Sequence, residues 1–216
     1  EDLIANIWNN PKEIPNNNID DDHNGYVDDI VGWDFVSNDN KPFDLAGSPI
    51  DVLSGKMQPG HGTHCAGNVA ARGVNGLGIS GVAPNVKIMI LRFLSEKGQG
   101  TTAEAVKSIR YAVDNGAKIL SNSWGSEGED PADDVQNQAL RDAIQYAQDK
   151  GALFIAAAGN GHNGTGYDND NDSAPAYPAS YDHDIIVSVA ALDSENELGS
   201  FSNWGMKSVD IGAPGV

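Results

Sequence analysis

Cysteine, basic residues and long apolar runs are all scarce in this chain of 216 residues, and each scarcity excludes something. The single cysteine, Cys65, excludes an internal disulfide. Only 13 lysines and arginines stand against 31 acidic residues, and the resulting charge of −18 argues against a nucleic-acid partner. No apolar run reaches the roughly 18 residues that a membrane-spanning helix needs, so the sequence predicts no membrane span.

The length suits one domain, and 39% of the residues are hydrophobic, which is enough to bury a core. The carboxylates are bunched at residues 20–29, 127–134 and 168–172. Such bunches form either a solvated acidic surface that aids solubility or a site for a cation. A secreted protein without disulfides needs another source of stability, and bound calcium stabilises a fold under oxidising and reducing conditions alike.

The pattern of residues changes near position 60. Residues 1–59 are irregular and rich in Asn, Asp, Pro and Gly, whereas in residues 60–216 short apolar runs alternate with amphipathic segments. Strands are predicted at residues 30–36, 87–93, 118–121, 153–158, 185–191 and 209–211. Helices are predicted from His61 to before Gly73, from Thr101 to a stop at Gly116, and from about Asp133 to Lys150. Because the strands are apolar along most of their length, we expect an α/β fold with a mostly parallel sheet and helices on both faces.

The most specific motif is residues 60–67, Gly-His-Gly-Thr-His-Cys-Ala-Gly, at the start of a predicted helix. A histidine there can take a proton from a hydroxyl and return it later, which makes His61 a candidate general base. The alternatives are a packed histidine and a metal ligand. Zinc is disfavoured because the His-Glu-x-x-His spacing of metalloprotease helices is absent.

A second motif, residues 156–161 (Ala-Ala-Ala-Gly-Asn-Gly), ends a predicted buried strand. The amide of Asn160 can donate hydrogen bonds to a developing negative charge; the alternative is an asparagine that only forms a turn beside glycine. Two further motifs are residues 121–125 (Ser-Asn-Ser-Trp-Gly) and residues 199–203 (Gly-Ser-Phe-Ser-Asn). The Gly-x-Gly-x-x-Gly pattern at residues 76–81 is set aside, because a helix precedes it and a strand follows, the reverse of a dinucleotide site.

Together, and in this order, these motifs resemble those of the subtilisin-like serine proteases, the subtilases of peptidase family S8. The resemblance implies a three-layer subtilisin-like fold and one partial peptidase domain over residues 1–216. It makes His61 the general base, His64 a structural residue and Asn160 the oxyanion-hole donor. It also assigns contacts with a polypeptide substrate to Gly98, Gln99, Gly100, Ser123, Trp124, Gly125, Ala158 and Gly159.

The family's serine motif, Gly-Thr-Ser-Met-Ala, does not occur among these residues, and neither does its aspartate motif. We therefore expect a piece of a complete enzyme, and the isolated chain to be inactive. The rival hypothesis is a non-catalytic module that binds calcium or a partner on a subtilase scaffold. The resemblance also implies a secreted or cell-surface enzyme, with a propeptide or protein inhibitor as a possible partner; an intracellular peptide-processing protease is the alternative.

Calcium is predicted from the pattern Asp-x-Asp-x-Asn-Gly at residues 20–25. With Gly25 at position six of a calcium loop, the predicted ligands are Asp20, Asp22, Asn24, the carbonyl of Tyr26, Asp28 and Asp29. Position twelve is Val31 rather than Glu, so this is not a complete EF-hand loop. The alternative is a solvated turn rich in Asx residues, and residues 168–172 form a weaker second candidate.

Cys65 follows the histidine motif directly. A thiol beside the general base would make the enzyme sensitive to mercurials; the simpler interpretation is a small buried hydrophobe.

Overall fold

The computed structural model describes residues 2–43, 60–127, 138–171 and 175–216, and it divides into two compact units, Glu1–Ser108 and Ile109–Val216. The helix α3 (Thr102–Asp114) begins in the first unit and ends in the second. None of the described helices is both long and apolar enough to cross a membrane.

The first unit is built around a short parallel pair, β1 (Gly32–Asp34) and β2 (Ile90–Arg92), with Trp33 opposite Leu91. A side chain at position 32 would lie 1.8 Å from the carbonyl oxygen of Ile90, so only glycine lets these strands approach. All three residues of β1 are buried, and an ion pair of 2.8 Å joins Asp34 to Arg92. The unit also contains η1 (Ile4–Asn6) and α2 (His61–Ala70).

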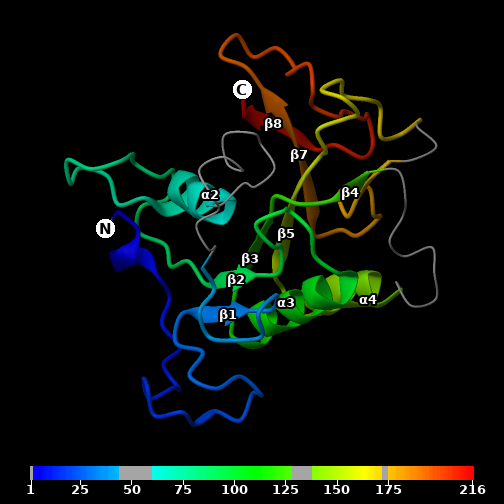
Figure 1. The fold of residues 1–216 in the computed structure, drawn as a ribbon. Coiled ribbons are helices and arrows are strands. Elements are labelled where there is room, and N and C mark those ends of the chain that lie inside the picture. The colour runs from blue at the N-terminus through cyan, green and yellow to red at the C-terminus, as the bar shows by residue number, and fades with distance from the viewer. Residues whose placement is uncertain (1, 44–59, 128–137, 172–174) are drawn as a thin grey trace. The chain divides into compact units, whose positions relative to one another are not determined.

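The second unit contains a four-stranded parallel sheet in the order β3-β5-β7-β8 (Figure 1). Its strands are β3 (Ile119–Asn122), β5 (Leu153–Ala157), β7 (Ile186–Leu192) and β8 (Ile211–Pro214). A second, antiparallel pair joins β4 (Ser126–Glu127) to β6 (Ala176–Tyr177). The parallel sheet confirms the predicted α/β architecture, whereas the β4–β6 pair was not predicted.

The helix α4 (Gln138–Asp149) packs against β5 through residues spaced as one helical face. Its buried residues are Leu140, Ala143, Ile144 and Ala147. The predicted stop holds, because Gly151 has a φ of 70° and the N–H of Ala152 bonds the carbonyl of Ala147 at 3.0 Å. The predicted start near Asp133 lies outside the described residues.

The start and end of α3 follow the predicted signals. The backbone N–H of Thr101 donates to the Glu104 carboxylate at 2.7 Å, and the N–H of Glu104 donates to the Thr101 hydroxyl at 3.2 Å. This reciprocal pair is a capping box, which satisfies two donors at the start of the helix. Gly116 follows the last turn with a φ of 86°.

Candidate functional site

His61 is the first residue of α2, and its side chain is exposed. Gly60 caps the helix in the left-handed region, with a φ of 87°. The other end of the helix is anchored, because the side-chain amide of Asn6 donates to the carbonyl of buried Ala70 at 2.8 Å. An imidazole on the exposed end of an anchored helix can exchange protons with a hydroxyl group placed beside it.

Cys65 and His64 lie on the same helix but have different neighbours. The Sγ atom of Cys65, which is half-buried, lies 4.0 Å from Nε2 of His61. His64 is exposed, and its Nδ1 lies 3.5 Å from the amide nitrogen of Asn68. The thiol therefore neighbours the candidate base, and the ring of His64 has a different neighbour.

Two of the predicted substrate segments follow adjacent strands of the parallel sheet. Ser123–Gly125 leaves the end of β3 and Ala158–Gly159 leaves the end of β5, and the paired residues Asn122 and Ala156 fix the register between the strands. The carboxyl ends of parallel neighbours share one edge of the sheet, which is where α/β proteins place ligands. The indole N–H of Trp124 donates to the Asn122 side chain at 3.0 Å, so this ring is held on the β3 side.

Asn160 stands three residues beyond the end of β5 and is exposed. Ala158 just before it is buried, and Gly159 has a φ of 113°, a conformation open to glycine but costly for other residues. The carboxamide of Asn160 thus sits on a sharp turn at the sheet edge, where it can donate to a ligand oxygen.

Gly98, Gln99 and Gly100 are exposed in a loop of the first unit. The N–H of Ser95 bonds the carbonyl of Gln99 at 2.8 Å, and the N–H of Gly98 bonds the carbonyl of Ser95 at 2.9 Å. These bonds close the loop on itself, and its three residues Gly98–Gly100 remain exposed.

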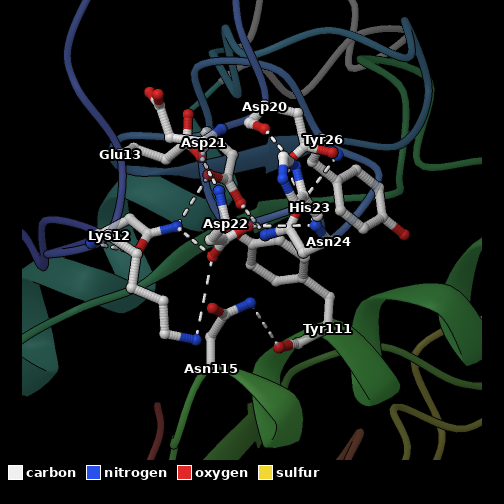
Figure 2. A network of polar contacts seen from close by, with 12 residues as sticks. Lys12, Glu13, Asp20, Asp21, Asp22, His23, Asn24, Tyr26, Tyr111 and Asn115 are labelled. Carbon is white, nitrogen blue, oxygen red and sulfur yellow. Dashed lines mark hydrogen bonds and ion pairs between the residues drawn. The ribbon is translucent and has the colours of Figure 1, made fainter.

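The acidic loop brings together three carboxylates, those of Glu13, Asp20 and Asp22 (Figure 2). One oxygen from each lies within 4.8 Å of the others. Burial raises the pKa of the Glu13 carboxyl. Burial also acts to raise the pKa of Asp20, but bonds from the N–H groups of Gly25 and Asn24 outweigh it and lower that pKa below its ordinary value.

The other predicted ligands of this loop have different partners. Asp28 accepts hydrogen bonds from the N–H groups of Asn17 and Asn18, and the fully buried Asp29 accepts one from the Asn24 amide at 2.9 Å. The side-chain oxygen of Asn24 accepts from the N–H of Tyr26 at 2.8 Å. The structure therefore brings Asp20 and Asp22 together with Glu13, a residue absent from the predicted ligand set.

The second acidic candidate, residues 168–172, forms no such group among the residues that the structure describes. Asp170 accepts bonds from the N–H groups of Lys207 and Ser208 at 2.8 and 2.9 Å, and the Ser208 side chain contributes most to lowering the pKa of Asp170. Asp172 lies outside the described residues. A further carboxylate, Asp2, fixes the loop after α2, since the amide of Asn75 donates to it at 2.7 Å.

Comparison with known proteins identifies the family. Residues 18–216 match the subtilase family, peptidase S8. This chain is a subtilase. It is 39% identical over 186 residues to thermitase from Thermoactinomyces vulgaris and 37% identical over 158 residues to subtilisin DY from Bacillus licheniformis. These matches cover 86% and 73% of the chain.

This subtilase spans only about half the length of those relatives, 55% of thermitase and 52% of subtilisin DY. Its fold resembles that of the prenylagaramide maturation protease PagA, with a TM-score of 0.60 and 30% identity over 80% of this chain and 56% of that one. It also resembles the epidermin leader peptide processing serine protease of Staphylococcus aureus, with a TM-score of 0.57 and 31% identity over 69% of this chain and 38% of that one. These neighbours support the subtilisin-like fold.

Sequence reasoning missed two features of the structure near the candidate residues. Glu13 lies seven positions before Asp20, outside the loop pattern, and no local signal marks it. Asn169 and Asn203 form a buried amide pair behind the turn that carries Asn160. Asn203 ends the motif at residues 199–203, which had no assigned role, and Asn169 lies inside the weaker acidic candidate.

Proposed function

We propose that the protein is a serine endopeptidase in which His61 is the general base and Asn160 the oxyanion donor. His61 takes the proton of a serine hydroxyl as its oxygen attacks the peptide carbonyl, and returns that proton to the leaving amine. The carboxamide of Asn160 donates to the oxygen that becomes negative in the tetrahedral intermediate. The proposal places the serine, and the aspartate that orients His61, outside these residues.

The substrate backbone is proposed to lie along Gly98–Gly100 and Ser123–Gly125, with Ala158–Gly159 as the opposite wall of the pocket for the side chain before the cut. Exposure of Gly98, Gln99 and Ser123 supports this assignment, because a substrate strand must be able to reach these residues. Ala158 is buried, so its contribution to the wall is shape rather than a polar contact.

The observation that carries the proposal is the family match over residues 18–216 to relatives that are themselves named serine proteases. The exposed positions of His61, at the start of α2, and of Asn160, in the turn after β5, add support, since a base and a donor must be accessible. The competing function is a non-catalytic module that uses the same scaffold to bind calcium or a protein partner.

A serine-directed covalent probe tests the proposal. We expect a fluorophosphonate to label one serine of the full gene product, and mass spectrometry to map the label outside residues 1–216. The same preparation should hydrolyse denatured casein, whereas the 216-residue polypeptide alone should be neither labelled nor active. Absence of labelling and hydrolysis in the full product would support the non-catalytic module, and labelling of a serine within residues 1–216 would contradict the assignment of the nucleophile.

Calcium is proposed as the structural cofactor of the acidic loop, with Glu13, Asp20 and Asp22 as its carboxylate ligands. Hard oxygen ligands are those that Ca²⁺ prefers, and one oxygen from each of the three carboxylates lies within 4.8 Å of the others. Lys12, 3.9 Å from Asp22, is a single positive charge beside these three carboxylates. Bound there, the ion would supply charge neutralisation and tie residue 13 to the loop at residues 20–22. The secondary candidates are Asn24, Asp28, Asp29 and the carbonyl of Tyr26.

Calcium should raise the thermal stability of the full protein. At about 100 times its Kd, a ligand that binds only the folded state adds about 2.7 kcal/mol, which for a domain of this size shifts Tm by about 5–10 °C. Chelation with EGTA should reverse the shift, as seen by calorimetry.

The matched variants are Asp22→Asn and Asp21→Asn. Asp22 belongs to the proposed ligand set, whereas Asp21 accepts its bonds from Ile14 and Asn17 within the loop. Only Asp22→Asn should abolish the calcium-dependent shift. An equal shift in both variants would rule out this ligand set.

The proposed location is secreted or cell-surface, and a propeptide or protein inhibitor is proposed as a partner besides the polypeptide substrate. The names of relatives do not decide the location, because one is a minor extracellular protease and another a major intracellular serine protease of the same Bacillus subtilis strain. A millimolar calcium supply outside cells suits the proposed cofactor. Fractionation of a culture into medium and cells would locate the protein.

A further inference from the structure

A buried pair of side-chain amides lies behind the turn that carries Asn160. Asn203 is fully buried and Asn169 is 4% exposed. The amide nitrogen of Asn203 donates to the amide oxygen of Asn169 at 3.1 Å. Two buried amides in direct contact are costly to desolvate unless their remaining groups are also bonded, and here they are.

The surrounding backbone fixes which way each amide points. The N–H of Tyr167 donates to Oδ1 of Asn203 at 3.2 Å, and the N–H of Ala176 donates to Oδ1 of Asn169 at 3.2 Å. If either side-chain amide were flipped, its NH₂ group would face a backbone N–H, and two donors would oppose each other. As a result, Nδ2 of Asn169 must point at its own acceptor, the carbonyl of Ala158, which it bonds at 2.8 Å.

The side chain of Asn169 and the backbone of Asn203 hold the two peptide planes that precede Asn160. Asn169 bonds the carbonyl of Ala158, and the backbone N–H of Asn203 bonds the carbonyl of Gly159 at 3.0 Å. A side chain on residue 159 would lie 2.4 Å from Nδ2 of Asn203, so glycine is needed for this approach as well as for its φ of 113°. Because the peptide planes on both sides of Gly159 are held by hydrogen bonds, its φ and ψ angles are both restricted.

We propose that Asn169 and Asn203 are positioning residues that set the place of the Asn160 carboxamide through the carbonyls of Ala158 and Gly159. This inference rests on the proposed function, in which Asn160 stabilises the oxyanion. Donors of this kind act at about 2.7–3.1 Å from the developing oxyanion, and a misplacement of about 1 Å can cost 10²-fold in rate. Without these hydrogen bonds, the flexible turn at Gly159 would allow the Asn160 carboxamide to occupy several positions.

The test is a double-mutant cycle in the full gene product, with kcat expressed per active site counted by burst titration. Counting active sites removes the effect of any unfolded fraction. Asn169→Ala should lower kcat about tenfold or more and change KM by less than about threefold. In an Asn160→Ala background, Asn169→Ala should change kcat by less than about twofold, because the group it positions is gone.

Two further variants keep the test decisive. Asn203→Ser, which acts one hydrogen bond further away, should give a smaller loss of the same kind and serves if Asn169→Ala folds poorly. Asn171→Ala is the matched control, since Asn171 is an exposed asparagine of the same loop whose side-chain amide donates to Asp168 and not to the turn that carries Asn160. It should leave kcat unchanged.

The outcomes separate this inference from the proposed function. If Asn169→Ala lowers kcat equally in both backgrounds, or lowers only Tm, the amide pair does not act through Asn160 and the inference is wrong. If Asn160→Ala alone keeps the wild-type kcat, the oxyanion assignment fails, and the inference fails with it.

Discussion

Replacement of His61 by alanine is expected to lower kcat for peptide hydrolysis by roughly a million-fold, the loss measured when the catalytic histidine of subtilisin, a protein of this family, is removed. Without the imidazole no group accepts the proton of the attacking serine, and what remains is the contribution of the oxyanion donors and of substrate binding. Because His61 is exposed on the first turn of α2, its loss should leave Tm nearly unchanged. The rate is measured with a peptide p-nitroanilide on the full gene product.

His64→Ala is the matched control for this variant. Both histidines are exposed on α2, three positions apart, so the two changes remove the same atoms from the same helix. Activity in His64→Ala should stay within about tenfold of the wild type, since its ring contacts Asn68 rather than Cys65. A comparable loss in both variants would mean that the helix, and not one imidazole, is what activity requires.

The elements with a clear period or clear end signals were predictable. The face of α4 that packs on β5 could be predicted from apolar residues spaced three and four apart. The end of the helix could be predicted from a glycine after a lysine, and Gly151 has the left-handed φ of 70° that glycine adopts at such an end. The strand β6 has only two residues and pairs with β4 from about fifty positions away, so no local pattern marks it.

The candidate site divides in the same way. His61 and Asn160 lie in motifs a few residues long, where glycines and a strand end mark a turn. Glu13 and the pair of Asn169 with Asn203 depend on residues brought together over longer distances: Asn169 and Asn203 are 34 positions apart. In the sequence, Asn169 lies among aspartates and looks like a residue of a calcium loop. The structure shows instead that its side chain is bonded to the buried backbone of Ala158 and Ala176.

Removal of the Asn160 carboxamide is the second large expected effect. Asn160→Ala should lower kcat by about 10²–10³ with little change in KM, the loss measured for one such donor in subtilisin rather than a value obtained from this geometry. The effect falls on kcat because the bond forms fully only to the oxyanion of the transition state and adds little to ground-state binding. Steady-state kinetics on a peptide p-nitroanilide give both constants.

Two variants distinguish the donated hydrogen bond from the shape of the turn. Asn160→Asp keeps the shape but places a carboxylate beside the developing oxyanion, so its kcat should fall below that of Asn160→Ala. Asn163→Gly changes an exposed asparagine of the next turn, whose φ of 52° glycine tolerates, and should leave kcat unchanged. If Asn160→Asp were as active as the wild type, charge at this position would be irrelevant to the transition state, and the turn after β5 would have to serve substrate binding instead.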